Sequence, residues 1–206
     1  MADIANQYPT SPGFETVNFE VNTPTLTSET FSGKLKRVGM GHSYYTWEVK
    51  YPNLIPLDAG TVQGFAAQTF GGQFSFEIVL PKISYSKLGT LQGTNTIIAQ
   101  GQNTAGGSTR INFAGAAANA YIFAAGDFVK FANHSKVYQV VAPCQANGSG
   151  TGTIFFSGAL VETVPAFTQI RITAIPFTAV LAANVQSWDV GRGGITSMSL
   201  AMREVW

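Results

Sequence analysis

The sequence contains few charged residues. Asp, Glu, Lys and Arg together make up 11% of its 206 residues, whereas soluble globular domains contain roughly 25%. The two signs nearly cancel, with 12 basic and 11 acidic side chains. A surface with so little charge lacks the repulsion that keeps soluble proteins apart. We therefore expect neighbouring molecules to cover much of it; the alternative is a monomer with a surface of Ser, Thr, Asn and Gln.

Cysteine and histidine are also scarce, which restricts the chemistry that the chain can perform. Cys144 is the single cysteine, so no disulfide can form within the chain, and we expect it to be a small buried hydrophobic residue. The two histidines, His42 and His134, form no set with metal-ligand spacing. We therefore assign no metal and no cofactor residue.

The sequence offers no convincing catalytic group. His134 has Asp127 seven residues upstream, but Asn133, His134 and Ser135 are common turn formers, which favours a turn over a catalytic triad. His42 is expected at a surface or strand edge. The carboxylates are scattered singly, without a pair suited to glycoside hydrolysis. We therefore predict that the protein is not an enzyme and assign no catalytic residue.

The sequence also lacks the marks of a nucleic-acid or membrane protein. Its densest basic stretch is Lys34, Lys36 and Arg37, too small for the footprint of a nucleic-acid groove. No window approaches 18 apolar residues, and the N-terminus is polar. We therefore expect no sequence-specific nucleic-acid binding, no membrane span, and synthesis in a cytoplasm.

Strand patterns dominate what is present. The stretch 31–51 is predicted to be a β-hairpin that turns at Gly39-Met40-Gly41. In its second strand, Tyr45, Trp47, Val49 and Tyr51 share one face and predict a half-buried strand. A helix is predicted over 58–70, capped by Asp58 and closed by Gly71-Gly72, with an apolar side made of Val62, Phe65, Ala66 and Phe70. A strand with alternating Phe74, Phe76, Ile78 and Leu80 follows.

The rest of the chain predicts many short strands. Residues 89–119 are small, polar and Gly-rich, and indicate a loose meander or an exposed excursion with strand seeds at 97–98 and 111–113. Turn signals about 8–12 residues apart favour a barrel or sandwich. The expected fold class is mainly β, with β-barrel or sandwich domains and one short α-helix. Further strands are predicted at 121–123, 128–131, 136–141, 153–156, 169–175, 177–181 and 196–202.

We predict two domains. Residues 1–88 form an N-terminal β-domain with one helix, completed by 179–206, and residues 89–178 form a second β-domain inserted between these parts. The reason is that Met198, Leu200 and Met202 alternate and need a partner sheet.

Three stretches resemble the tail-tip or baseplate structural proteins of tailed bacteriophages, which are similar in role to distal tail proteins. The first is SGKLKRVGMGHSYYTWEVKYPNLIPLDAGTVQGFAAQTFGGQFSFEIVLP, the second is AAGDFVKFANHSKVYQVV, and the third is the C-terminal ITSMSLAMREVW. They cover a little over half of the chain as patterns of hydrophobic and turn residues. The excursion at 89–119 departs from the family's pattern.

The resemblance implies a virion structural protein that forms a homohexameric ring at the distal tail end. Such a ring joins the tail tube protein to the hub, spike or host-recognition proteins, and DNA passes through its lumen. The low charge suits subunit contacts that close a ring through apolar faces. The alternatives are a neck or capsid-decorating virion protein and, from another class, a carbohydrate-binding β-module.

Both chain ends are predicted to meet neighbouring subunits. The N-terminal segment has no hydrophobic period of its own to order it, and the C-terminus ends on a large aromatic residue. Burial of Trp206 in its own domain is the alternative for that end. The predicted interface residues are Tyr8, Phe14, Arg203, Glu204 and Trp206.

Overall fold

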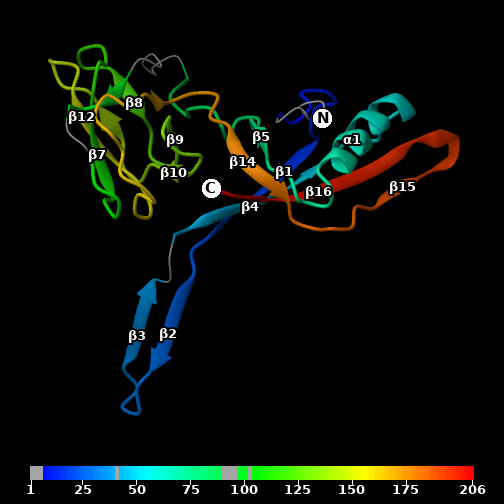
Figure 1. Cartoon of the computed structure of the whole chain (residues 1–206), viewed down its shortest axis with the longest axis horizontal. Coiled ribbons are helices and arrows are strands. Elements are labelled where there is room, and N and C mark those ends of the chain that lie inside the picture. The colour runs from blue at the N-terminus through cyan, green and yellow to red at the C-terminus, as the bar shows by residue number, and fades with distance from the viewer. Residues whose placement is uncertain (1–6, 40–41, 90–96, 102–103) are drawn as a thin grey trace.

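The computed structural model describes residues 7–39, 42–89, 97–101 and 104–206. In these residues, strands predominate and a single α-helix is present, which confirms the expected mainly β fold class (Figure 1). The strands form several separate sheets.

The largest sheet joins segments from both ends of the chain. Its strand order is β1-β4-β16-β14-β5, and β15 pairs with the first part of β16. The described strand pairs in it are antiparallel. The bounds are β1 (Thr16–Asn22), β4 (Tyr44–Lys50), β5 (Phe76–Ile78), β14 (Phe177–Leu181), β15 (Trp188–Val190) and β16 (Thr196–Glu204).

Alternation along the central strands creates the core. Tyr45, Trp47 and Val49 of β4 are buried on one face, as predicted from their period of two. Met198, Leu200 and Met202 of β16 are buried on the same side and in the same core. The C-terminal strand is thus held by β4 and β14.

Helix α1 (Pro56–Gln68) packs against this core and begins two residues earlier than predicted. Asp58 is not the cap, because Ile55 holds that position without a side-chain hydrogen bond and Pro56 supplies the pre-set first helical turn. Val62, Phe65 and Ala66 are buried as expected. Phe70 is wrongly predicted: it follows the helix with a positive φ of 47° and is 64% exposed.

The predicted hairpin over 31–51 is wrong in its pairing. Strand β3 (Leu35–Gly39) pairs with β2 (Thr25–Glu29), while β4 pairs with β1 and β16. The turn is at Thr30–Lys34, where Gly33 has φ 77° and donates its backbone N–H to the carbonyl of Thr30. Residues 40–41 of the predicted turn lie outside the described residues.

We call the resulting β2–β3 hairpin the arm; it projects away from the rest of the chain (Figure 1).

The middle of the chain builds a second core of its own. Its three small sheets pair β12-β7-β6, β10-β9-β13 and β11-β8. Cys144 is buried in this core, as predicted. The bounds are β6 (Ile98–Ala99), β7 (Arg110–Ala114), β8 (Tyr121–Phe123), β9 (Phe128–Phe131), β10 (Val137–Gln139), β11 (Cys144–Gln145), β12 (Gly152–Phe155) and β13 (Ile170–Arg171).

The described parts of 89–119 are more ordered than an exposed excursion, because Ile111 and Phe113 of β7 and Ile97 next to β6 are buried in this second core. The structure contains two hydrophobic cores, and the division of the chain into two domains stays a prediction. Phe177, assigned to the inserted domain, lies in β14 of the large sheet.

Candidate assembly surfaces

Both strands of the arm are exposed along their whole length. These strands, β2 and β3, pair with each other. Four large apolar side chains lie on it, namely Leu26, Phe31, Leu35 and Val38. An isolated two-stranded hairpin is marginally stable in water. An apolar arm of this kind therefore gains most by docking on another molecule.

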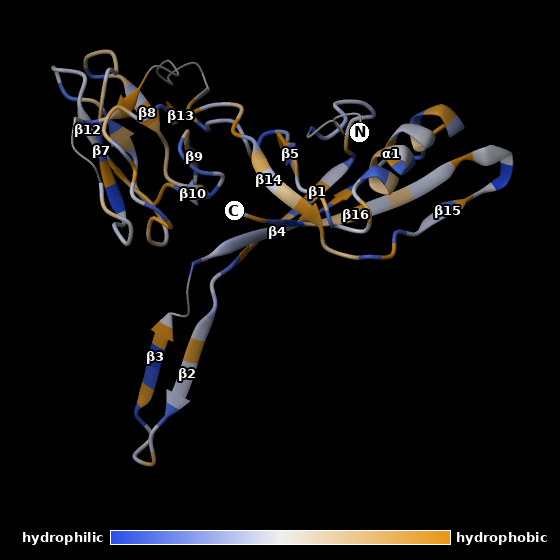
Figure 2. Cartoon of the chain, in the orientation of Figure 1, coloured by the Kyte–Doolittle hydropathy of each residue, from blue (hydrophilic) through white to orange (hydrophobic). Residues whose placement is uncertain are grey.

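The two faces of the arm differ in charge. The pairs Leu26–Val38 and Ser28–Lys36 lie on one face, since alternate residues of a strand share a face. Lys34 continues that face, because it is two residues from Lys36 and its carbonyl accepts the backbone N–H of Thr30. This apolar and cationic side is called the Leu26–Lys36 face. Figure 2 shows the alternating hydrophobic and hydrophilic bands along both strands.

A second exposed apolar surface lies where α1 begins beside the β15–β16 hairpin. Leu54 and Thr196 exchange both backbone hydrogen bonds at 2.9 Å, which holds the start of α1 against β16. Trp188 is paired with buried Met198, and Val190 with buried Thr196, so both face the helix side of the sheet. We call this region the α1–β15 surface; its exposed apolar residues are Ile55, Leu57, Trp188 and Val190.

Two of the predicted interface residues are buried in their own chain, which corrects their assignment. Tyr8 is 6% exposed, its hydroxyl bonds to that of Tyr51, and its ring packs on Phe65 at 4.7 Å. Burial raises the pKa of Tyr8 far above its ordinary value. The N-terminal segment from residue 7 is therefore ordered by its own domain.

Glu204 is the second corrected residue, because it is buried in an ion pair with Lys136. Its carboxylate also accepts the backbone N–H of Val137 at 3.0 Å and of Tyr45 at 3.3 Å. Burial lowers the pKa of Lys136 and raises the pKa of Glu204, while the attraction between the two opposes both shifts. The pair joins the end of β16 to β10 across 68 residues of sequence.

The other three predicted interface residues retain exposed surface. Arg203 is exposed and lies over the ring of Tyr44 at 4.2 Å. Trp206 is 48% exposed, and Lys136 lies over its ring at 4.2 Å. Phe14 is partly buried against Tyr8 and Tyr51. Contact of these residues with a neighbour stays a prediction.

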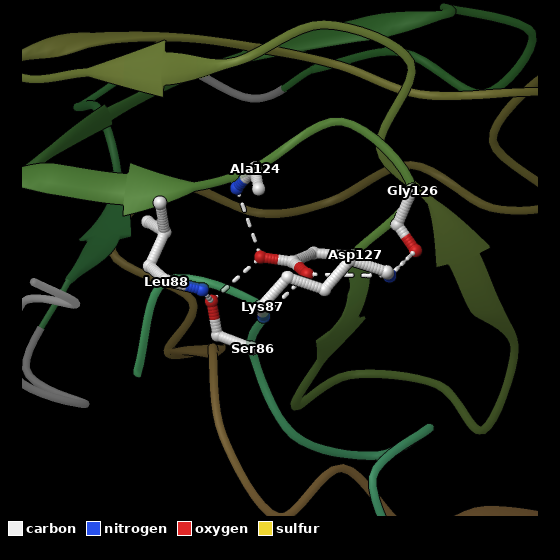
Figure 3. Close-up of polar contacts among 6 residues, drawn as sticks. All are labelled: Ser86, Lys87, Leu88, Ala124, Gly126 and Asp127. Carbon is white, nitrogen blue, oxygen red and sulfur yellow. Dashed lines mark hydrogen bonds and ion pairs between the residues drawn. The ribbon is translucent and has the colours of Figure 1, made fainter. Parts of the chain in front are cut away.

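The residues weighed for catalysis have structural partners. Asp127 is buried and accepts hydrogen bonds from Ser86 Oγ at 2.6 Å and from the backbone N–H groups of Lys87 and Ala124 at 2.9 Å (Figure 3). His134 Nε2 instead bonds to the hydroxyl of Tyr138 at 2.9 Å. Asp127 thus ties the segment after β5 to the β8–β9 turn.

His42 is partly buried, with Nδ1 3.2 Å from the carbonyl of Ala159. Among the described residues, no group of three His, Cys, Asp or Glu side chains could hold a metal ion. No helix in the described parts of the chain is both long and apolar enough to cross a bilayer.

Replacing Asp127 with Ala should destabilise the fold by about 1–3 kcal/mol, because two partly buried N–H groups and one hydroxyl lose their acceptor. Urea unfolding measures the loss, and hydrogen exchange should show faster exchange at the Lys87 and Ala124 amides. The control is Asp189→Ala, which removes an exposed carboxylate. Equal stability of the two variants would contradict a tethering role for Asp127.

The arm was missed by the sequence reasoning. Its strands are short and more than half polar or charged, so they carry no strong hydrophobic period. The available signal was Ser32-Gly33 between two five-residue runs, together with the basic stretch that includes Lys34 and Lys36.

Comparison with known proteins leaves the family open: no protein-family model matches this chain, and neither does any curated protein.

Proposed function

We propose that this chain is a virion structural protein that forms a ring at the distal end of a bacteriophage tail. In this role it connects the tail tube to the hub, spike or host-recognition apparatus. The observation that carries the proposal is the arm, because its exposed strands carry apolar side chains and, among the described residues, pair with each other alone, which suits them to contact with another subunit.

The composition supports assembly as the role. Charge is low throughout the chain, and large apolar side chains are exposed on the arm and on the α1–β15 surface. Contacts between two different surfaces of identical subunits generate closed rings when the rotation closes. The specific place in a phage tail rests on the resemblance of the three sequence stretches.

The alternatives use the same β-rich fold differently. A neck or capsid-decorating protein would also assemble, on a different part of the particle. A carbohydrate-binding module would need exposed aromatic rings for stacking on sugars. Trp47, Tyr45 and Tyr51 are buried, but Tyr85, Tyr121, Trp188 and Trp206 are exposed, so the aromatic residues do not separate the two roles. The resemblance of the three sequence stretches favours assembly.

The mass of the purified full-length chain tests the proposal. Sedimentation velocity and native mass spectrometry should show a single closed species of about six copies, and electron microscopy should show a ring with an open lumen. A chain that stays monomeric at high concentration contradicts the proposal. Assembly into sheets or shells without a lumen would favour a capsid-decorating role.

The variant Leu26→Asn with Val38→Asn should shift this species to monomer and leave the free energy of unfolding unchanged, because both side chains are exposed. Val141→Asn is the matched control, since Val141 is equally exposed but lies outside the arm. Normal assembly of the arm variant would remove the arm from the subunit contact.

A further inference from the structure

We infer that the Leu26–Lys36 face of the arm docks on the α1–β15 surface of a second copy of this chain. The inference rests on the proposed function, because it identifies the contact that closes the same ring. It concerns two surfaces of the chain that are exposed, apolar and well separated.

The position of the arm makes this contact intermolecular. The arm leaves the large sheet from β1 and β4 and extends away from α1 and β15, which lie at another end of the molecule (Figure 1). In this arrangement the arm of one chain does not lie on its own α1–β15 surface. A contact between two different surfaces is heterologous, and repeated heterologous contacts build rings or filaments.

The two surfaces match in apolar character. The arm offers Leu26 and Val38 as a cross-strand pair on one face. The receiving surface offers Trp188 and Val190 on one side of β15 and Leu57 at the start of α1. The two parts are linked through Thr196, which pairs with both Val190 and Leu54. Large aromatic side chains such as Trp188 are typical centres of subunit contacts.

The docking face of the arm is cationic, and the receiving surface carries a carboxylate. Lys34 and Lys36 lie on the docking face of the arm, whereas Glu29 and Arg37 lie on its other face. Asp58 lies in the first turn of α1 and Arg192 in the turn between β15 and β16, whereas Asp189 pairs with Ser197 and faces the opposite side of β15 from Trp188 and Val190. Among the described residues, none forms an ion pair with Lys34, Lys36 or Asp58. These charges are therefore available to a neighbour, and they orient it.

Engineered disulfides in the full-length chain test the docking. Val38→Cys is combined in turn with Leu57→Cys, Trp188→Cys and Val190→Cys, because a disulfide forms only when the two Cα atoms approach within about 7 Å. At least one pair should give a ladder of linked subunits on a non-reducing gel after mild oxidation. Mixing the Val38→Cys chain with the matching single variant should give dimers.

Two controls exclude accidental cross-linking. Val38→Cys with Val141→Cys pairs the arm with an equally exposed valine outside the α1–β15 surface and should give no ladder. The unmodified chain should also give none, since Cys144 is buried.

Charge reversal gives a second readout that does not depend on oxidation. Lys36→Glu should weaken subunit association about tenfold or more, because it places a carboxylate against Asp58. Asp58→Lys in the same chain should recover most of the loss. Arg37→Glu is the matched control, since Arg37 lies on the opposite face of the arm, and it should have little effect.

The outcomes separate this inference from the proposed function. A ring that assembles, shows no cross-link for any of the three pairs and responds equally to Lys36→Glu and Arg37→Glu overturns the docking while the proposed function stands. A chain that stays monomeric at every concentration overturns both. Cross-links together with rescue by Asp58→Lys support the docking.

Discussion

Replacing Glu204 with Ala should lower the free energy of unfolding by about 3–5 kcal/mol, which is the usual cost of leaving a buried charge without its partner. Lys136 is 3% exposed and would keep its ammonium group between the rings of Tyr45 and Trp206 without a counter-charge. Two backbone N–H groups, of Tyr45 and Val137, would also lose their acceptor. For a chain of this size, the melting temperature should fall by roughly 6–20 °C.

A matched variant on the neighbouring strand calibrates this effect. Glu48 forms an ion pair with Lys50 at 4.0 Å, but both side chains are substantially exposed. Glu48→Ala should cost less than about 1 kcal/mol, because solvent screens the pair. Urea unfolding of both variants, followed by tryptophan fluorescence, gives the comparison.

The double variant Lys136→Met with Glu204→Ala should recover part of the loss, because the unpaired charge is removed while the two N–H groups still lack an acceptor. If Glu204→Ala costs no more than Glu48→Ala, the ion pair does not hold the C-terminal strand to β10.

The second large effect is expected at Phe177, which is fully buried at the centre of an aromatic cluster. Its ring is 5.3 Å from that of Phe128 and 5.5 Å from that of Trp47, measured between centroids. Phe177→Ala should destabilise the fold by about 3–5 kcal/mol, because it removes these contacts and leaves a cavity. Phe128 belongs to β9, so the cavity would lie where the middle of the chain packs on the large sheet.

Phe155→Ala is the control for this prediction. Phe155 is 42% exposed on β12 and should cost no more than about 1 kcal/mol when truncated. Both variants are compared by urea unfolding, with hydrogen exchange to locate the loosened amides. Rapid exchange confined to 97–172 in Phe177→Ala would show that this aromatic cluster does not join β9 to the large sheet.

The functional proposals depend on the same packing. The Glu204–Lys136 pair and the Phe177–Phe128 contact join the large sheet to the segment that forms β9 and β10. The arm and the α1–β15 surface both belong to the large-sheet part of the chain. We therefore expect core variants to lower stability, and arm variants to lower assembly at unchanged stability.

Strand and helix positions were largely predictable because their signals are local. The alternation of Tyr45, Trp47 and Val49 predicted β4, and that of Met198, Leu200 and Met202 predicted β16. The helix was found from the spacing of Val62, Phe65 and Ala66. Its start was misplaced because Asp58 resembles a cap, whereas Pro56 fits the first helical position equally well.

Strand partners were less predictable because two turns competed. Gly39-Met40-Gly41 and the Thr30–Lys34 turn both contain glycine, and either could close a hairpin. In the structure, β4 pairs with β1 along one edge and with β16 along the other. Strand β3 pairs with β2 instead of β4. The choice depends on burial against a strand about 150 residues away, which no local pattern contains.

By itself, the sequence determined the mainly β class, the single helix, the positions of the main strands and the shortage of charge, since each follows from composition or from a short-range period. Only the tertiary structure decided that Tyr8 and Glu204 are buried, that β2 and β3 pair with each other, and that Thr196 pairs with both Val190 and Leu54. The physical reason is that burial and surface are properties of contacts between distant segments. The folded chain places Lys136 next to Glu204 and Phe65 next to Tyr8, and no pattern near Glu204 or Tyr8 in the sequence predicts these contacts.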